Sequence, residues 1–170
     1  MLFSIKSKLF ILFLCFSIVS FSQTIPCKNI TINDGLPSNN IKCIFKDSRG
    51  VLWIGTEDGL CSYNGKDYKI FNQNNGLKYN NVWSITEDND HNLWFSFYGD
   101  GIAKYNGKKF QYFNTKNGLI HNSVRKLHYS KKFNCLLIGT ENGLSLFDGK
   151  KFKSFIEKTP ISKFQVMGIN

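Results

Sequence analysis

The chain has 170 residues, a formal net charge of +10 and an aromatic content of 15%. This basic balance is compatible with an acidic ligand, an anionic membrane surface or nucleic acid as a partner. Because Arg49 and Arg125 are the only arginines and no lysine run is long enough for a nucleic-acid arm, we exclude nucleic acid and expect lysines scattered over the surface.

The first 22 residues have the pattern of a secretory signal peptide. Lys6 and Lys8 precede an apolar run at residues 9–21, and a basic segment followed by an apolar one is typical of export signals. Ser20 and Ser22 supply small residues at positions −3 and −1, so we expect cleavage after Ser22 and an exported protein of the periplasm or cell envelope. An uncleaved anchor is the weaker alternative, since a spanning helix needs about 20 apolar residues.

The cysteines indicate a reduced core. Those that follow the expected cleavage site are Cys27, Cys43, Cys61 and Cys135. Export permits disulfides, but the spacings match no metal-binding motif, and we expect no metal and no cofactor. Cys61 occupies a repeat position that holds Ala103 and Ser145 in the other copies, which indicates a small buried slot. We therefore expect buried thiols and no disulfide framework.

The rest of the chain is built from three copies of one repeat. Gly35, Gly76 and Gly118 each precede a leucine and lie 41 and 42 residues apart. The turn pairs Asn64-Gly65, Asn106-Gly107 and Asp148-Gly149 recur at intervals of 42 residues. Similar apolar segments lie between these markers at residues 52–56, 93–97 and 136–140. An internal period of this length predicts a stacked repeat architecture.

Each repeat contains four short apolar runs separated by turn residues, which in the first copy are residues 41–45, 51–56, 60–63 and 68–71. Short runs rich in branched and aromatic residues indicate strands. The Asn-Gly pairs indicate two-residue hairpin turns, and residues 47–50 indicate a looser turn. Four antiparallel strands in about 40 residues is the size of a propeller blade. Trp53 and Trp94, on the second strand, should fill the gap between blades, where the third copy has Leu137.

The sequence therefore predicts an all-β fold, namely a partial β-propeller of three four-stranded antiparallel blades plus the first strand of a fourth. The expected parts are a signal peptide at 1–22, a lead-in at 23–33, repeats at 34–74, 75–116 and 117–155, and the start of a truncated fourth repeat at 156–170. Phe164 and Met167 stand there in the places of Ile41 and Ile44. Open propeller edges invite pairing, so we expect the missing blades to come from a longer chain or from self-association.

Residues 34–155 resemble the two-component regulator propeller repeat. The resemblance is carried by Gly35-Leu36, Asn39, Trp53-Ile54-Gly55-Thr56, Gly59-Leu60, Tyr63-Asn64-Gly65, Phe71 and their later copies. In that family such repeats form the periplasmic sensor of membrane histidine kinases, many of which sense oligosaccharides. The resemblance implies a ligand-sensing module, and a histidine kinase as the full-length protein. No kinase core is present here, so we expect no enzymatic activity of this chain.

Positions that differ among otherwise matching repeats are candidates for ligand contact, because they are free of the shared packing role. Lys42, Trp83 and Arg125 share one position on the innermost strand, and the turn containing Tyr98 is one residue longer than its counterparts, with the tyrosine at its tip. The candidate ligand-binding residues are Tyr79, Trp83, Tyr98, Asp100, His121, Arg125, Glu57 and Glu141. Aromatic rings beside amides and carboxylates suit a saccharide. The alternative is that each such residue is unconstrained surface.

Other residues suggest a metal site, an enzyme or a protein-binding propeller. Residues 88–92 resemble the start of a calcium loop, but the glycine and the closing glutamate of that loop are missing, so a hairpin turn is expected. A sialidase would need a cluster of arginines, and His91, His121 and His128 have no evident serine or cysteine partner. A carbohydrate-active enzyme using Glu57 and Glu141, and a structural or protein-binding propeller, stay open as alternatives. Asn39, Asn80 and Asn122 recur faithfully and should cap turns.

Overall fold

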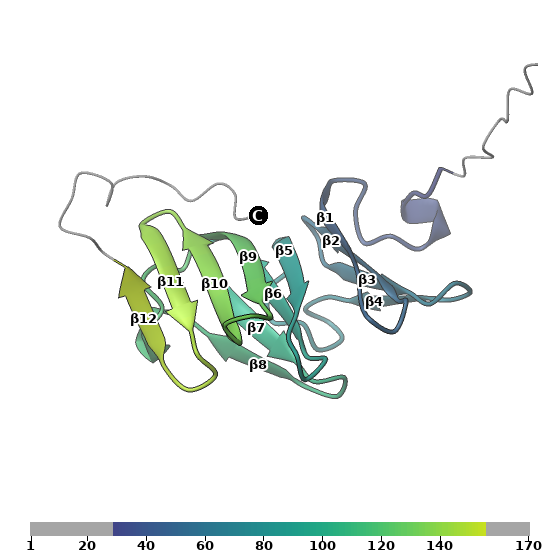
Figure 1. The fold of residues 1–170 in the computed structure, drawn as a ribbon. Coiled ribbons are helices and arrows are strands. Elements are labelled where there is room, and N and C mark those ends of the chain that lie inside the picture. Colours follow the sequence, from purple (N-terminus) through teal and green to yellow (C-terminus); the bar gives the residue numbers. More distant parts are fainter. Residues whose placement is uncertain (1–28, 156–170) are drawn as a thin grey trace, which may run out of the picture.

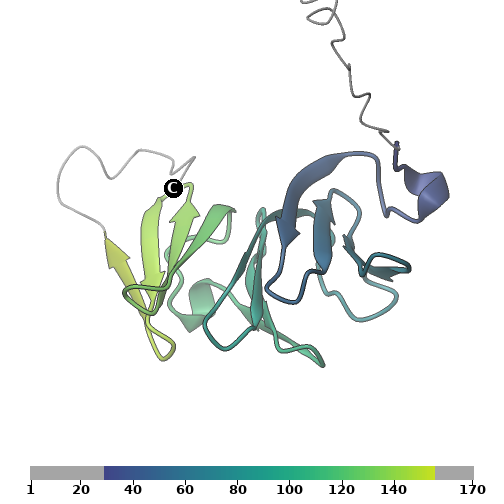
Figure 2. The same ribbon diagram turned by 45° about the vertical axis from the view of Figure 1, so that its right-hand side comes forward.

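The computed structural model describes residues 29–155, so the expected signal peptide, its cleavage site, Cys27 and the fourth repeat lie outside the described residues. The described strands form three separate four-stranded antiparallel sheets, each ordered as in the chain. The sheets stand side by side like the blades of a fan (Figures 1 and 2). The predicted all-β architecture of three blades is confirmed.

The strand bounds are as follows. Blade 1 comprises β1 (Ile41–Lys46), β2 (Leu52–Thr56), β3 (Leu60–Tyr63) and β4 (Tyr68–Phe71). Blade 2 comprises β5 (Val82–Glu87), β6 (Leu93–Phe97), β7 (Gly101–Tyr105) and β8 (Phe110–Phe113). Blade 3 comprises β9 (Val124–Ser130), β10 (Cys135–Thr140), β11 (Gly143–Phe147) and β12 (Phe152–Phe155). Two short 3-10 turns, η1 (Ile32–Asp34) and η2 (Thr115–Asn117), precede blades 1 and 3.

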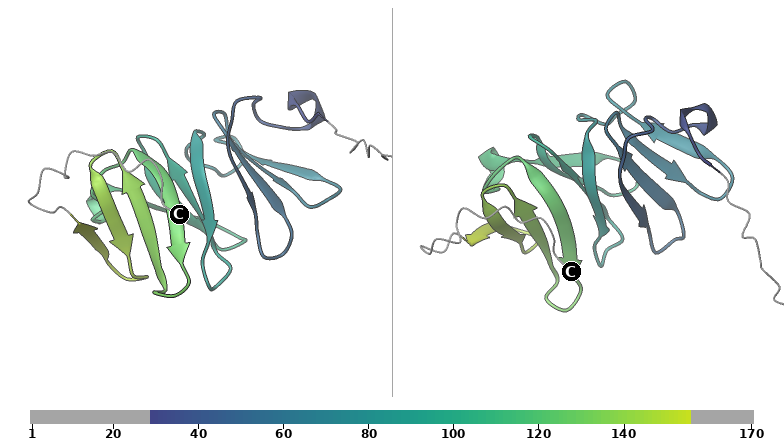
Figure 3. Two further views of the ribbon diagram at one scale, coloured as in Figure 1. Left: turned by 45° about the horizontal axis from the view of Figure 1, so that its top comes forward. Right: turned by 90° about the horizontal axis from the view of Figure 1, so that it is seen from above.

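The innermost strands β1, β5 and β9 lie next to one another across the blade boundaries (Figure 3). Because the strands alternate in direction, the turns within the hairpins β1–β2 and β3–β4, and their copies, lie at one end of the blades. The second-to-third-strand turns and the connections between blades lie at the other end. We name these the hairpin end and the loop end.

The connections between blades are built alike, and the recurring asparagines explain why. Asn39, Asn80 and Asn122 each accept a hydrogen bond through Oδ1 from the backbone N–H seven residues earlier, at 3.0, 3.2 and 2.9 Å. Asn114 and Asn117 form a capping box around η2. Amide side chains of this kind replace the backbone partners that a loop lacks. The predicted capping role of the three asparagines is confirmed.

The turns between third and fourth strands differ in detail from the prediction. The turn of blade 1 is closed between Asn64 and Asp67, with Gly65 and Lys66 at its centre. Only Gly65 has a positive φ, of 100°, so a single left-handed residue suffices, as in a turn with glycine at the first central position. Asn64 Oδ1 accepts the N–H groups of Lys66 and Asp67 at 2.9 and 2.8 Å. The asparagine therefore caps the turn and is not one of its central residues.

The turns between first and second strands are held by a buried aspartate that also fixes the tryptophan. Asp47 Oδ2 accepts the Trp53 indole N–H at 3.0 Å, and Oδ1 accepts the Val51 N–H at 2.9 Å. Asp88 binds the Trp94 indole at 2.9 Å in the same way. The segment that resembled a calcium loop is thus the predicted hairpin turn.

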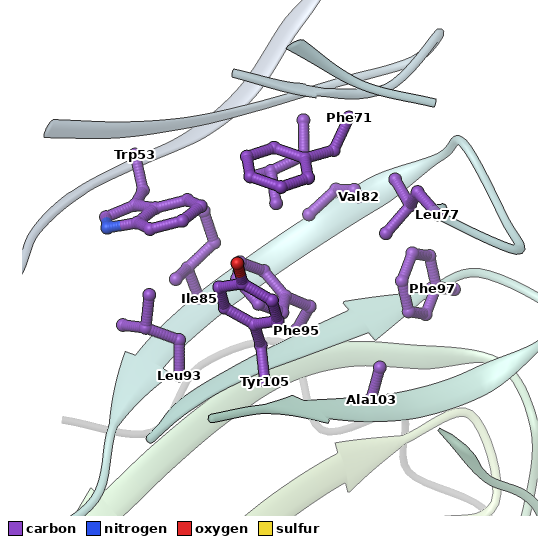
Figure 4. Close-up of a cluster of buried hydrophobic side chains, with 11 residues drawn as sticks. Trp53, Phe71, Leu77, Val82, Ile85, Leu93, Phe95, Phe97, Ala103 and Tyr105 are labelled. Carbon is purple, nitrogen blue, oxygen red and sulfur yellow. The ribbon is translucent and has the colours of Figure 1, made fainter. Parts of the chain in front are cut away.

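The two tryptophans fill the gaps between blades, as predicted. The Trp53 ring of blade 1 packs against Phe95 and Tyr105 of blade 2, with centroids 5.8 and 6.1 Å apart (Figure 4). The Trp94 ring of blade 2 packs against Phe147 of blade 3 at 5.5 Å. Trp53 belongs to the buried cluster between blades 1 and 2, and Trp94 to the one between blades 2 and 3, where large aromatic side chains contribute much of the buried apolar area.

The described cysteines are free thiols, which agrees with the prediction. Cys61 is fully buried, like Ala103 and Ser145 at the same repeat position. Burial raises the pKa of the Cys43 thiol to about 12 and that of Cys61 to about 11. Since the thiolate is the reactive form, both thiols are inert at neutral pH.

Candidate functional site

Each innermost strand contains a β-bulge at the same place near its start. In β1 the register shifts between Ile41 and Cys43, which leaves Lys42 as the extra residue. In β5 and β9 the shifts leave Trp83 and Arg125 in the same situation. A bulge turns its extra residue out of the regular alternation of the strand. The backbone therefore sets the direction of the three variable side chains.

In every blade the bulged residue contacts the first residue after the second strand. Blades 1 and 3 hold an ion pair there, whereas blade 2 holds a stack of two aromatic rings. The pairs are Lys42 with Glu57 (Nζ to Oε2, 3.9 Å), Trp83 with Tyr98 (ring centroids 5.1 Å apart) and Arg125 with Glu141 (Nη2 to Oε1, 2.6 Å). We name these six residues the loop-end cluster.

The aromatic pair of blade 2 also contacts the charged residues of both neighbouring blades. Lys42 Nζ lies 5.5 Å and Arg125 Cζ 5.4 Å from the Trp83 ring centroid. The Tyr98 hydroxyl donates to Glu141 Oε1 of blade 3 at 2.5 Å. Cations near aromatic faces are attracted by the ring quadrupole. The six side chains therefore form one continuous surface across three blades.

The contact between Tyr98 and Glu141 shifts the pKa of both groups. Hydrogen bonds from Tyr98 and from Arg125 hold the pKa of Glu141 below its ordinary value. The hydrogen bond to Glu141 raises the pKa of Tyr98. The cluster thus presents an ionised carboxylate beside a protonated phenol, which are complementary hydrogen-bonding groups for a polar ligand.

Two N–H donors of the cluster are buried without a hydrogen-bond partner among the described residues. They are Nε1 of Trp83 and Nε of Arg125. A buried donor that is left unpaired costs about 1–3 kcal/mol. The cluster is therefore not saturated by its own hydrogen bonds: these two N–H donors are shielded from solvent and have no acceptor among the described residues.

The cluster includes Glu57, Trp83, Tyr98, Arg125 and Glu141 among the predicted site residues. The sequence did not single out Asn40, whose amide donates to Glu57 Oε2. The predicted position of Tyr98 at the tip of the longer turn is wrong. Its ring is half-buried on Trp83, directly after β6.

Tyr79 lies apart from the cluster, in the packing of blade 2. Its ring contacts Phe97 and Tyr112 edge-on, with centroids 5.6 Å away in both cases. Lys78 Nζ lies 5.1 Å from the same ring. These contacts indicate a packing role for Tyr79, and its predicted ligand contact stays a prediction.

Asp100 and His121 lie outside the contacts that define the cluster. Burial raises the pKa of Asp100, and the charge of Lys78 acts against this rise. His121 borders the cluster, because its ring acts electrostatically on Glu141. Its Nδ1 accepts the Ser123 N–H at 3.0 Å.

A concave region of about 480 Å³ lies at the hairpin end, away from the loop-end cluster, and is lined by parts of all three blades. His91, for which the sequence showed no serine partner, lies here with Nδ1 2.9 Å from Ser48 Oγ. The Ser48 hydroxyl donates to Glu87 Oε1 at 2.8 Å, and the same His91 Nδ1 lies 3.4 Å from Glu87. A catalytic serine–histidine–acid array needs the acid on the other ring nitrogen. The contacts therefore link blade 1 to blade 2 and do not form such an array.

Within residues 29–155 no group of three or more histidine, cysteine, aspartate or glutamate side chains could hold a metal ion. The same part of the chain contains no helix that is long and apolar enough to cross a bilayer.

The comparisons with known proteins concern the repeats and the fold. The family described as two component regulator propeller matches residues 35–58 and 76–99, which begin the first two repeats. Histidine kinase P4 from Formosa agariphila is 36% identical over 62 residues, which make up 36% of this chain and 4% of that protein.

Two solved structures share the fold. The extracellular domain described as that of the hybrid two component system BT3049 from B. thetaiotaomicron matches with a TM-score of 0.68 at 21% identity, over 85% of this chain and 20% of that chain. A catalytically inactive virginiamycin B lyase from Staphylococcus aureus matches with a TM-score of 0.61 at 17% identity, over 75% of this chain and 45% of that chain. At such identities the likeness is one of propeller fold alone, and the chain spans less than half of either protein.

Proposed function

We propose that the protein is part of the ligand-sensing propeller of a two-component signalling system, because the family model of the two component regulator propeller matches the starts of its first two repeats, residues 35–58 and 76–99. The loop-end cluster is the ligand site of this proposal. Export to the periplasm is part of it, supported by the signal-like residues 1–22 and by the extracellular origin of a structural neighbour.

The observation that carries the proposal is the contrast among equivalent positions. The bulge is the same in all three blades, yet its extra residue is Lys42, Trp83 or Arg125. The packing position in the gaps keeps a large apolar or aromatic residue in every copy, namely Trp53, Trp94 and Leu137, whereas the bulged residue changes between charged and aromatic. Different side chains on an equivalent backbone, with Trp83 in contact with both Lys42 and Arg125, build an asymmetric surface suited to recognition.

The chemistry of the cluster favours an oligosaccharide. A sugar ring has an apolar C–H face that can stack on the face of an aromatic ring, and Trp83 and Tyr98 provide the rings. Its hydroxyls need both donors and acceptors, which Glu57, Glu141 and Arg125 supply. Such a mixture of apolar walls and a few convergent polar groups is typical of small-ligand sites.

Intrinsic tryptophan fluorescence tests the proposal, because the chain has three tryptophans. Trp53 and Trp94 are buried, with 4% and 2% of their surface exposed, whereas Trp83 is half-buried in the cluster. We expect one member of an oligosaccharide panel to change the emission. The change should vanish in Trp83→Phe and persist in Trp53→Phe, the matched control.

Arg125→Gln gives a second readout by titration calorimetry. Loss of a charged hydrogen-bonding group should weaken binding at least about tenfold. A panel in which no saccharide binds, or in which Trp83→Phe and Arg125→Gln bind as the unaltered protein does, would show that the cluster is not the ligand site.

A further inference from the structure

Lysines gather at the hairpin end of blades 2 and 3. The turn between β7 and β8 contains Lys108 and Lys109, the turn between β9 and β10 contains Lys131 and Lys132, and the turn between β11 and β12 contains Lys150 and Lys151. All six side chains are exposed. The expectation of scattered lysines is therefore wrong for this end. Alternating strand direction brings turns that are distant in sequence to one edge, the lower edge of blades 2 and 3 in Figure 1.

Most acids at this end are engaged in holding the turns. Asp88 is buried and bound to the Trp94 indole. Asp148 accepts the N–H groups of Lys150 and Lys151 at 3.0 and 2.9 Å, and its carboxylate lies 3.2 Å from Lys153. Asp90 alone stays exposed on the turns of these two blades without such a role. The exposed charge at this end is therefore strongly positive.

An exposed aromatic ring stands among the lysines. Phe133 follows Lys131 and Lys132 in the turn and is 71% exposed. Lys132 Nζ lies 5.3 Å from its ring centroid. Among the described residues it is the only aromatic side chain of the exposed large hydrophobic group. A ring held out in water on a turn tip gains nothing from folding, but it gains free energy at an apolar boundary.

We propose that the hairpin end of blades 2 and 3 docks on an anionic lipid bilayer, with the six lysines against the lipid phosphates and Phe133 in the interface. Basic side chains next to an aromatic ring are the combination that binds such interfaces. An acidic polymer would use the lysines but not the ring. The surface lies opposite the loop-end cluster, so this proposal stands or falls independently of the proposed function.

The test is co-sedimentation of the exported form of the protein with vesicles of two compositions. We expect binding to phosphatidylcholine mixed with phosphatidylglycerol and little binding to phosphatidylcholine alone. The double variant Lys131→Gln/Lys132→Gln should bind roughly 30-fold more weakly, given the contribution of a lysine near an anionic surface. Phe133→Ser should bind roughly tenfold more weakly.

The matched control is Lys78→Gln/Lys116→Gln, which removes two exposed lysines from the loop end and should bind as the unaltered protein does. An equal loss in this control would overturn the proposal, because net charge alone would then explain binding. Loss in the Lys131/Lys132 variant with none in Phe133→Ser, together with binding to soluble polyaspartate, would assign the surface to an acidic macromolecule and overturn the membrane assignment. Circular dichroism confirms that each variant is folded.

Discussion

The gaps between blades and the loop-end cluster use the same repeat in opposite ways. In the gaps, Trp53 and Trp94 occupy the equivalent position of blades 1 and 2. Their indole N–H groups donate to the equivalent aspartates, Asp47 and Asp88. In the cluster, one position is filled by lysine, tryptophan and arginine in turn. The comparison shows that residues shared between copies pack one blade against the next. Residues that differ among the copies lie on a backbone whose conformation does not depend on their side chains.

Burial within the gaps depends on the neighbouring blade. Ile85 and Leu127 are 7% and 3% exposed because blades 1 and 2 cover them. Ile44, at the same position of blade 1, is 64% exposed. Stability in repeat proteins is a sum of repeat and neighbour terms, and these values show how much of each blade's apolar surface its neighbour covers.

The largest expected effect on the free energy of unfolding is in the gap between blades 2 and 3. Trp94→Ala should lower the free energy of unfolding by about 3–5 kcal/mol, because a large buried ring is replaced by a cavity. Urea denaturation followed by circular dichroism measures it. Leu137→Ala changes the equivalent position of blade 3, which is half-buried, and should cost less than about 2 kcal/mol. Equal losses in the two variants would contradict the role assigned to the tryptophan.

The next effect concerns the aspartates that fix the indoles. Burial alone would raise the pKa of Asp88, but hydrogen bonds from Trp94 and Asn92 and the charge of Lys104 hold it below the ordinary value. A lowered folded-state pKa gives stability that is present above the unfolded pKa of about 3.9 and is lost as the pH falls through the lower, folded-state pKa.

Asp88→Asn should therefore cost about 1–3 kcal/mol at neutral pH and should flatten the decline of stability below about pH 4. Urea midpoints measured from neutral to acidic pH test this. Asp90→Asn, an exposed position in the same turn, is the matched control and should retain the original pH dependence. A decline that is just as steep in Asp88→Asn would mean that other groups cause it.

The smallest effect on stability is expected in the cluster. Lys42 and Glu57 are 3.9 Å apart, and the Glu57 side chain is half exposed, at 50%. Lys42→Gln should change the free energy of unfolding by less than about 0.5 kcal/mol, since exposed ion pairs contribute little. A shift of the urea midpoint as large as that of Trp94→Ala would erase the distinction between the two regions.

Much of the fold could be predicted from the sequence because the same pattern of strands and turns recurs in three repeats. Strand order, the gap-filling role of Trp53 and Trp94 and the capping asparagines follow from aligned positions. The repeats also pointed to most of the cluster, because positions 42, 83 and 125 differ among copies. What pattern alone could not show were contacts between blades, such as Ser48 with His91.

The bulges are the other feature that sequence reasoning missed. All three copies carry the bulge at the same position, so an alignment of the repeats shows no insertion that would reveal it. Likewise, Asp47 and Asp88 read as ordinary turn residues. Their indole contacts arise because the turn folds back over the side chain six residues later.

The bulge shared by the three blades separates the paired strands from the side chains of the loop-end cluster. The extra residue has no ladder partner of its own, so its replacement leaves strand pairing and blade packing intact. When a blade is duplicated, the copy keeps the strand pairing. It also keeps two positions that are free to diverge, the bulged residue and the first residue after the second strand. If the loop-end cluster binds the ligand as proposed, ligand preference would change through two substitutions per repeat. A library varied at positions 42, 57, 83, 98, 125 and 141 would sample many specificities on one unchanged architecture.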